Sequence, residues 1–505
     1  MCSADTRPAR SPDAAPRTLQ EAFARHARRE GVGRGIRLLD ERGRPTFLAY
    51  SDLLVEGAAA SRALDRAGLR RHDRVMILLP TCRTLITTII GCILRGIIPF
   101  PGSPGELWSR REDAPQELLA LARQAGVRAI IAAARRTAVL SRQLGPGDPR
   151  PLPVESLRHA PAVGLEDKPC RPQPEDAALL VGTAGPGSQR RPVLLTQRNL
   201  VSHLQALGRA LRMGEREILC GFAGLDTTTG LVDQLLFGLF FGFDQVLLAP
   251  EWVASQPLRW IRAISDFRGT LTLAEDTAYG LAAHRLHDEE PEAATAPLDL
   301  ASLRRAVAIG TTVRPGTQEA FLRRFGPHGL AANVFLPAYG LAEASGILTI
   351  GRSGARPLSD RFDRRSLCPG QYVHTAGRGD SRGRLMMSSG MPLQGQLLRI
   401  VGVGGEPLDE GMVGRIQAQG SALTPGIDGR DGPDAEDWLQ TGDIGFVSEG
   451  ELFVIGSQEE GFELNGLRYD PEELEVVAGE VPGIRQGGVA AFTVDEEDGE
   501  KPVVV

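Results

Sequence analysis

Short apolar runs alternate with amphipathic stretches through most of the chain. Apolar side chains recur at helical spacing over residues 18–30, and a second helix is predicted over residues 52–67 with Ser51 as its N-cap. Apolar runs of strand length lie at residues 36–39, 47–50, 74–80, 97–100, 127–132, 177–181, 245–248 and 305–309. Such runs separated by helices are typical of parallel strands that are buried on both faces. The pattern therefore predicts an α/β fold in which helices cover both faces of a parallel sheet.

The pattern changes from about Leu397 onward. Short strands are predicted at residues 398–401, 414–418 and 451–455, with glycine and proline turns between them. Residues 426–436 are polar and glycine-rich, which predicts a surface loop. We expect this part to form a small β-rich subdomain that packs against the α/β layers.

The composition is that of a globular protein, and it narrows the range of partners. The chain has 505 residues, enough for two or three packed subdomains, and its 42% apolar and 24% charged residues are near the averages for folded proteins. A net charge of −6, from 57 basic and 63 acidic residues, offers no basic footprint for nucleic acid or for an anionic membrane. The expected partner is a small molecule or another protein, and no nucleic acid.

Nothing in the pattern indicates export or a membrane span. The first 16 residues carry Asp, Arg and three prolines in place of an apolar signal core. Charged side chains interrupt the two most apolar stretches, residues 75–100 and 231–249, so we expect them to be buried helices and strands. The six cysteines are scattered without metal-ligand spacing, as expected of reduced thiols in a cytoplasmic protein.

A glycine-rich stretch directly after a predicted strand could hold phosphates. Backbone N–H groups in such a turn can approach a polyphosphate, and guanidinium groups add positive charge. A surface loop of glycine and proline would have the same composition, so this stretch alone leaves both interpretations open. It spans residues 181–192, and its candidate ligands are Thr183, Gly185, Gly187, Ser188, Arg190 and Arg191.

Two further motifs narrow the choice. Residues 335–344 read Phe-Leu-Pro-Ala-Tyr-Gly-Leu-Ala-Glu-Ala, and residues 438–445 read Trp-Leu-Gln-Thr-Gly-Asp-Ile-Gly. Together with Leu-Thr-Gln-Arg-Asn-Leu at residues 195–200, they resemble the signatures of fatty acyl-AMP ligases, a branch of the adenylate-forming (AMP-binding) enzymes. The resemblance covers residues 18–505, and the long stretch between Glu343 and Gly390 favours this branch over the acyl-CoA synthetases.

The resemblance implies a fold and a reaction. The implied fold is a large N-terminal adenylation domain over residues 17–458, made of layered α/β subdomains and the small β-rich subdomain. A disordered tail, residues 1–16, would precede it, and part of a small α+β C-terminal lid domain, residues 459–505, would follow it. In the implied reaction a fatty acid or related carboxylic acid is activated with ATP. The acyl-adenylate is then passed to a thiol of an acyl carrier protein or of a polyketide or peptide synthase module.

Each implied role falls on a residue of a quoted motif. Glu343 would bind Mg²⁺, and Tyr339, with Gly340 beside it, would lie next to the adenine. Asp443 would accept both ribose hydroxyls, which suits a carboxylate because it has two acceptor oxygens and no donor. The residues of the glycine-rich stretch would hold the triphosphate, and Arg191 and Glu343 would be the catalytic residues. A tyrosine in a strand-to-helix turn with a surface glutamate is the purely structural alternative.

The departures from the family pattern fall on its chemistry. In the phosphate loop Arg191 and Pro192 stand where Lys and Gly are usual, which keeps the charge but removes a backbone donor. The usual His-Asp-Met-Gly is Thr-Thr-Thr-Gly at residues 227–230, and Gly-Ala-Glu-Pro becomes Ile-Gly-Thr-Thr at 309–312. At the hinge of the family, Ser457 replaces an Arg and Glu459 replaces a Lys.

The end of the chain and the departures leave alternatives open. Residues 501–505 lie in a predicted strand, and the lysine that neutralises the α-phosphate in relatives would come after it. One alternative to a working ligase is therefore a catalytically impaired member that binds a nucleotide, an acyl-adenylate or a protein partner. Another is an excised domain of a multidomain synthase. Residues 231–243 could form the wall of an acyl tunnel or simply a buried helix.

Overall fold

The structure, a computed structural model, describes most of the chain. The described residues are 15–27, 33–103, 114–157, 170–183, 190–214, 216–284, 297–424, 426–427, 438–459, 461–464, 467–479, 481, 483–484, 488–496 and 499–505. The predictions for residues 1–14 and for residues 428–436 of the surface loop lie outside these ranges.

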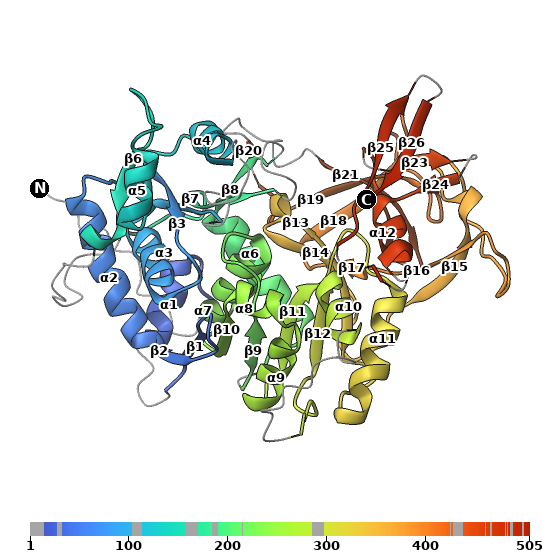
Figure 1. Ribbon diagram of the computed structural model, residues 1–505, viewed down its shortest axis with the longest axis horizontal. Coiled ribbons are helices and arrows are strands. Elements are labelled where there is room, and N and C mark those ends of the chain that lie inside the picture. The colour runs from blue at the N-terminus through green and yellow to red at the C-terminus, as the bar shows by residue number, and fades with distance from the viewer. Residues whose placement is uncertain are drawn as a thin grey trace, which may run out of the picture.

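The centre of the molecule is a sheet with nine strands among the described residues (Figure 1). In spatial order they are β17 (Met391–Pro392), β14 (Gly346–Ile350), β13 (Phe335–Leu341), β12 (Arg305–Ile309), β11 (Leu271–Glu275), β9 (Ile218–Gly221), β10 (Asp244–Leu248), β1 (Gly35–Leu39) and β2 (Pro45–Ala49). The strands from β13 to β1 pair in parallel, and the strands at both edges pair antiparallel. The predicted parallel sheet is confirmed, with antiparallel strands added at its edges.

Both faces of this sheet are buried because successive side chains alternate between two hydrophobic cores. Leu247 and Val307 lie in one core, and their neighbours Val246 and Ala306 lie in the other. The first core also contains side chains of α6 (Gln197–Ala210), of a π-helix (Thr229–Leu236) and of α7 (Phe237–Phe241). The second contains side chains of α8 (Pro250–Ser255), α9 (Leu258–Asp266), α10 (Asp276–His284) and α11 (Pro315–Phe325).

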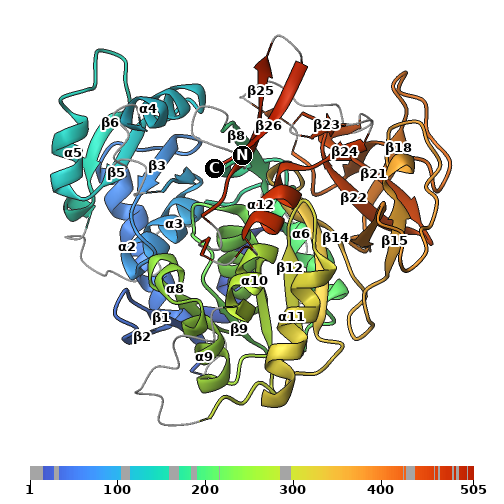
Figure 2. The same cartoon turned by 45° about the vertical axis from the view of Figure 1, so that its right-hand side comes forward.

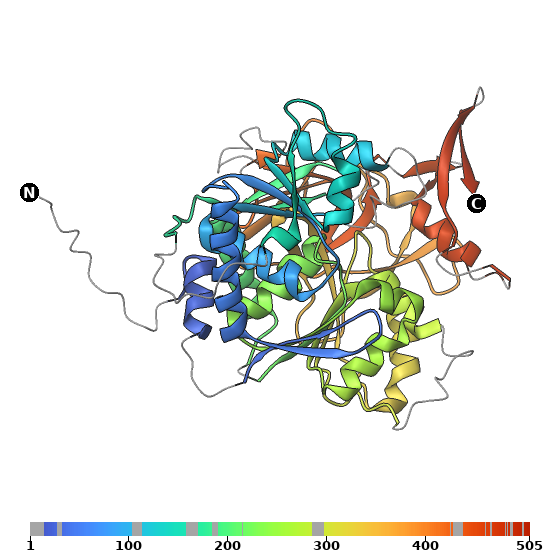
Figure 3. The same ribbon diagram turned by 60° about the vertical axis from the view of Figure 1, so that its left-hand side comes forward.

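A second, smaller parallel sheet lies toward the N-terminal side. Its strands are, in order, β4 (Ile98–Pro101), β3 (Arg74–Leu78), β5 (Ala129–Ala132) and β6 (Arg150–Pro153). The accompanying helices are α1 (Leu19–Ala27), α2 (Tyr50–Arg66), α3 (Arg83–Arg95), α4 (Ala114–Gln124) and α5 (Ala134–Leu140). The first three of them lie side by side at the edge of the molecule (Figure 3).

The start of α2 corrects one prediction. The helix begins at Tyr50 with Ala49 as its N-cap, and no side chain caps it, so Ser51 is not the N-cap. The reason is tertiary: Tyr50 is buried, and its hydroxyl donates to the carbonyl oxygen of Phe243 at 2.6 Å. This contact fixes the point at which the chain leaves β2 and enters the helix.

The glycine-rich stretch joins two antiparallel strands. The run at 177–181 is a strand as predicted, β7 (Ala177–Gly182), but it pairs antiparallel with β8 (Pro192–Thr196) and not within a parallel sheet. A hairpin without a crossover helix can only connect antiparallel neighbours. A short third strand, β20 (Gly426–Ile427), pairs antiparallel with the other side of β8.

The C-terminal part is rich in strands, as predicted (Figure 2). One sheet has the order β18 (Gln396–Val401), β19 (Gly414–Gly420), β21 (Leu439–Ser448) and β22 (Glu451–Ser457). The hairpin of β15 (Ser359–Asp363) and β16 (Gly383–Met387) precedes it in the chain. The chain closes with β23 (Phe462–Leu464), β24 (Leu467–Tyr469), α12 (Pro471–Gly479), β25 (Ala491–Glu496) and β26 (Gly499–Val504). Of the helices that the structure describes, none has the length and apolar character to cross a membrane.

Candidate functional site

Strand β13, which carries the Tyr-Gly-Leu-Ala-Glu motif, ends at the side of the large sheet where the parallel strands have their carboxyl ends and where ligands commonly bind. Tyr339 and Gly340 lie near its carboxyl end, and Glu343 follows in a 3-10 turn (Ala342–Ala344). Ser345 (φ 63°) and Gly346 (φ 132°) then reverse the chain into β14. Because ligands of open α/β sheets bind outside the carboxyl ends of the parallel strands, the motif stands where a substrate would be expected.

Tyr339 and Asp443 meet although they are far apart in the sequence. The Tyr339 hydroxyl donates to Oδ2 of Asp443 at 2.6 Å, and the N–H of Asp443 donates to Oγ1 of Thr441 at 3.2 Å. The tyrosine ring is only 1% exposed and packs with Leu348 and Ile416 in a core between β13 and the C-terminal sheet. Burial, together with the Asp443 carboxylate, raises the pKa of Tyr339 well above its usual value. The hydroxyl is therefore protonated and acts as a fixed donor, and Asp443 remains partly exposed.

Glu343 lies in the turn after β13, and this turn contacts the hairpin of β7 and β8, which carries the predicted phosphate loop and is called the phosphate hairpin below. The Glu343 side chain is partly buried, and this burial raises its pKa, while the positive charge of Arg191 acts in the opposite direction. Glu343 in turn contributes to the raised pKa of Tyr339. Arg191 therefore favours the ionised form of Glu343, and the charge of Glu343 favours the protonated hydroxyl of Tyr339.

The two ends of the predicted phosphate loop are fastened to each other. The N–H of Arg191 donates to Oγ1 of Thr183 at 3.0 Å, and the N–H of Thr183 donates to the carbonyl oxygen of Arg191 at 3.0 Å. The Nε of Arg190 lies close to Gly182. Pro192 is the first residue of β8, a strand position that tolerates a proline. The other predicted phosphate ligands lie outside the described residues: Gly185, Gly187 and Ser188.

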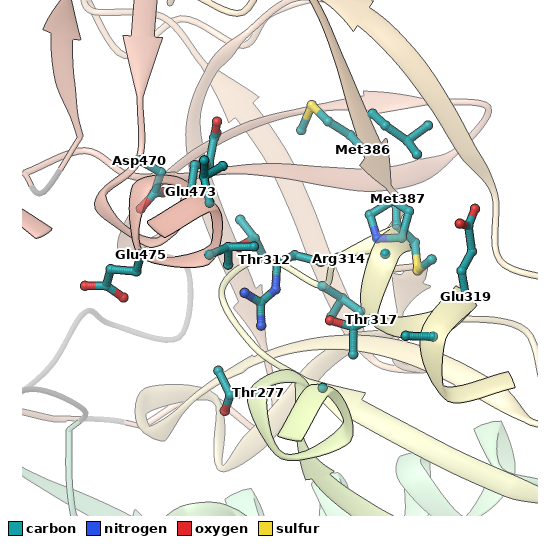
Figure 4. A pocket seen from close by; sticks show the side chains of 18 of the residues that line it. Thr277, Thr312, Arg314, Thr317, Glu319, Met386, Met387, Asp470, Glu473 and Glu475 are labelled. Atoms are coloured by element: carbon teal, nitrogen blue, oxygen red, sulfur yellow. The ribbon is translucent and has the colours of Figure 1, made fainter. Parts of the chain in front are cut away.

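A cavity of about 660 Å³ lies between α10, α11, β16 and α12 (Figure 4). Tyr339, Glu343 and Asp443 do not line it, but Thr312, one of the residues that replace the family's Gly-Ala-Glu-Pro, does. The cavity walls are held by ion pairs. Arg314 pairs with the buried Asp276 at 2.7 Å. On α12, the carboxylate of Glu473 forms ion pairs with both Arg364 and Arg384, each at 2.6 Å.

A family model described as AMP-binding enzyme matches residues 20–427. The chain belongs to this family. It is 27% identical, over 65% of its length and 59% of the relative's, to "Probable long-chain-fatty-acid–AMP ligase FadD30" of Mycobacterium tuberculosis, so it spans less than two thirds of that relative. It is 27% identical to 4-hydroxyphenylalkanoate adenylyltransferase of Mycobacterium marinum over 86% of its length and 71% of the relative's. A solved structure from a study of fatty acyl-adenylate ligases from E. coli and L. pneumophila superposes with a TM-score of 0.86 at 23% identity, covering 99% of this chain and 88% of that one. The predicted fold class, a layered N-terminal part with a C-terminal lid, is thereby confirmed.

In this member of the AMP-binding enzyme family, two of the segments that depart from the family pattern make local hydrogen bonds. Thr227 caps its own turn: its hydroxyl donates to the carbonyl oxygen of Gly224 at 2.8 Å and accepts from the N–H of Gly230 at 3.1 Å. The following π-helix is buried in the first core. At the hinge, the N–H of Gln458 donates to the carbonyl oxygen of Gly442 at 2.8 Å. A side chain of β24 also reaches the hinge, since Arg468 donates to the carbonyl oxygen of Ser457 at 2.5 Å.

Sequence reasoning missed a buried hydrogen-bonded pair below the signature turn. Nε2 of His203 on α6 lies 2.6 Å from Oδ1 of Asp233 on the π-helix, and both side chains are almost fully buried. The Asp233 carboxylate also touches Gly346, where an added Cβ would stand 2.7 Å from it. The sequence did contain one indication of this pair: Asp233 lies in an otherwise apolar run, and a buried acid requires a partner. The identity of that partner was not readable from the sequence.

Proposed function

We propose that this chain is a fatty acyl-AMP ligase-like enzyme, which activates a fatty or related carboxylic acid with ATP and passes it to a carrier-protein thiol. The observation that carries the proposal is the hydrogen bond from Tyr339 to Asp443 next to the turn that carries Glu343, a turn that the hairpin carrying Arg191 also contacts. Such a site offers acceptors for a ribose, a carboxylate for a cation and a positive charge for phosphate. Family membership and the fold support this reading.

Asp443 suits the ribose because its carboxylate is partly exposed and already oriented. One carboxylate oxygen of Asp443 accepts from the Tyr339 hydroxyl, and the backbone N–H of Asp443 donates to the Thr441 hydroxyl. The Asp443 side chain therefore has little freedom left. A carboxylate can accept several hydrogen bonds, which leaves acceptor capacity for ribose hydroxyls. The tyrosine ring is buried, so Tyr339 presents its hydroxyl, and contact of its ring face with adenine would require the ring to move.

The residues present fit Mg²⁺. This ion is usually bound by one or two carboxylates together with substrate phosphates and water, so a single glutamate is enough. Within the described ranges, no group of three His, Cys, Asp or Glu side chains could hold a metal ion without such help. A cation at Glu343 would also stabilise the ionised form that burial disfavours. When bound, it would supply neutralisation of phosphate charge.

The chain's own residues would act by positioning and by charge. Thr183, Arg190 and Arg191, with the loop residues Gly185, Gly187 and Ser188, would hold the triphosphate. The substrate carboxylate oxygen attacks the α-phosphorus, the bond to the bridging oxygen breaks, and pyrophosphate leaves with the electron pair. We assign residues 17–458 to the adenylation domain, residues 459–505 to the lid, and the protein to the cytoplasm, where carrier-protein modules are available.

The test is ATP–pyrophosphate exchange that depends on added acid, across fatty acids of several lengths and shorter aryl or keto acids. Exchange with at least one acid, abolished in Asp443→Asn, is the expected result. Absence of exchange from a folded chain, with no heat on titration of MgATP, would refute the proposal. Heat without exchange would leave a nucleotide-binding module, the alternative that the absence of Arg and Lys at Ser457 and Glu459 favours.

A further inference from the structure

The segment that leaves β19 makes hydrogen bonds to two parts of the proposed site at once. Thr424 is 3% exposed. Its N–H donates to the carbonyl oxygen of Glu343 at 2.7 Å, and its hydroxyl donates to the carbonyl oxygen of Leu194, on β8, at 2.6 Å. One side chain and its own backbone thus connect the Glu343 turn to the phosphate hairpin.

Neighbouring contacts fix the same segment from both sides. Nδ2 of Asn199, in the first turn of α6, donates to the carbonyl oxygens of Leu423 at 2.6 Å and Ser421 at 3.1 Å. From the other side, the hydroxyl of Ser345 donates to the carbonyl oxygen of Ala422 at 2.6 Å. At residues 426–427 the chain pairs with β8 as β20. The segment 421–424, called the bridge below, therefore has little freedom relative to either neighbour.

We infer that Thr424 is a positioning residue, which holds Glu343 at a fixed separation from the phosphate hairpin. The inference rests on the proposed function, in which Glu343 and the hairpin bind the same cation–triphosphate unit. Groups that share one ligand must be held to within about 0.5 Å, and this is achieved by locking their supports. Because the bridge bonds to main-chain carbonyls on both sides, it sets the spacing of the two backbones directly.

The matched pair Thr424→Val and Thr424→Ser isolates the hydroxyl. Valine has nearly the same shape and keeps the N–H bond to Glu343, but it leaves the Leu194 carbonyl without this donor. Serine keeps the donor. Since a lost buried hydrogen bond weakens an arrangement roughly tenfold, T424V should raise the Mg²⁺ concentration for half-maximal exchange about tenfold, and T424S should stay within about twofold of the parent.

A second readout needs neither substrate nor activity. Amide hydrogen exchange, followed by mass spectrometry, should become faster in T424V in the peptides that cover residues 192–197 and 341–347, with peptides from α9 and α11 unchanged. T424S should match the parent in all four. If T424V does not fold, Ser345→Ala removes the opposite anchor of the bridge and should give the same two changes at smaller size, about threefold in Mg²⁺ dependence.

The outcomes separate the inference from the proposed function. A parent that neither exchanges pyrophosphate nor binds MgATP refutes the function, and the hydrogen-exchange arm still decides whether the bridge couples the two backbones. An active parent together with a T424V variant of unchanged Mg²⁺ dependence overturns the inference alone. A lower kcat with unchanged Mg²⁺ dependence and unchanged hydrogen exchange overturns it as well, because a structural defect elsewhere would produce that result.

Discussion

Replacing Tyr339 by Phe and Asp443 by Ala, singly and together, measures the contact on which the proposed site depends. Phe keeps the buried ring and removes only the hydroxyl. Asp443→Ala removes the carboxylate that accepts this hydrogen bond, so the buried Tyr339 hydroxyl loses its acceptor. The two single variants therefore break the same 2.6 Å hydrogen bond from opposite ends, with different consequences for what remains.

The structure sets the order of the three effects. Hydrogen bonds to charged groups contribute about 1.5–3 kcal/mol, and the lower value applies to Tyr339→Phe because water can reach the partly exposed Asp443. Asp443→Ala should cost about 3 kcal/mol, since it adds the penalty of a buried hydroxyl without its acceptor. In the Tyr339→Phe background the Asp443→Ala change should cost little more. The coupling energy should accordingly be about 2–3 kcal/mol.

Urea unfolding of the four proteins, followed by circular dichroism and by tryptophan fluorescence, supplies the free energies. The pair Arg198 and Glu175, in which both side chains are exposed, serves as a control cycle and should give a coupling below about 1 kcal/mol. Additive effects of Tyr339→Phe and Asp443→Ala, within about 0.5 kcal/mol, would refute the reasoning, because they would mean that the hydroxyl and the carboxylate do not interact in solution.

Three further predictions concern charge. Glu343→Gln should abolish acid-dependent exchange, yet it should stabilise the ligand-free protein at neutral pH. The reason is that burial raises the pKa of Glu343. The stabilising contribution of the Glu343 side chain is therefore complete below its unfolded pKa of about 4.3 and is lost as the pH rises through its folded pKa. Melting curves of variant and parent should coincide at low pH and separate above it; a parallel offset at all pH values would contradict this. Arg191→Lys should keep exchange within about tenfold of the parent, with Arg191→Gln at least tenfold worse still, and equal losses would show that charge is not what Arg191 supplies. Glu473→Gln leaves two largely buried arginines without their shared carboxylate, which should lower the free energy of unfolding by about 3–5 kcal/mol and increase protease cleavage after β22. Glu319→Gln, at an exposed position, should change neither the stability nor the cleavage. Unchanged cleavage in Glu473→Gln would show that these ion pairs do not hold α12 in place.

The layered architecture and the places of the signature motifs could be predicted from the amino-acid pattern alone. Continuous apolar runs can only be buried on both faces, so the strands around Val246 and Val307 were predicted with the correct fold class. The Tyr-Gly-Leu-Ala-Glu motif likewise identified the strand end at which Tyr339 and Glu343 lie. These features are local, because period, composition and motif order are readable within a few residues.

Which of these residues touch depends on how elements that are distant in the sequence pack together. The Tyr339–Asp443 bond, the bridge through Thr424 and the buried pair of His203 and Asp233 each join segments that are distant in sequence. The antiparallel pairing of β7 and the early start of α2 were also set by distant partners. A side chain's sequence neighbours define what it can donate or accept, but the packing of distant elements chooses its partner, and that choice creates the site.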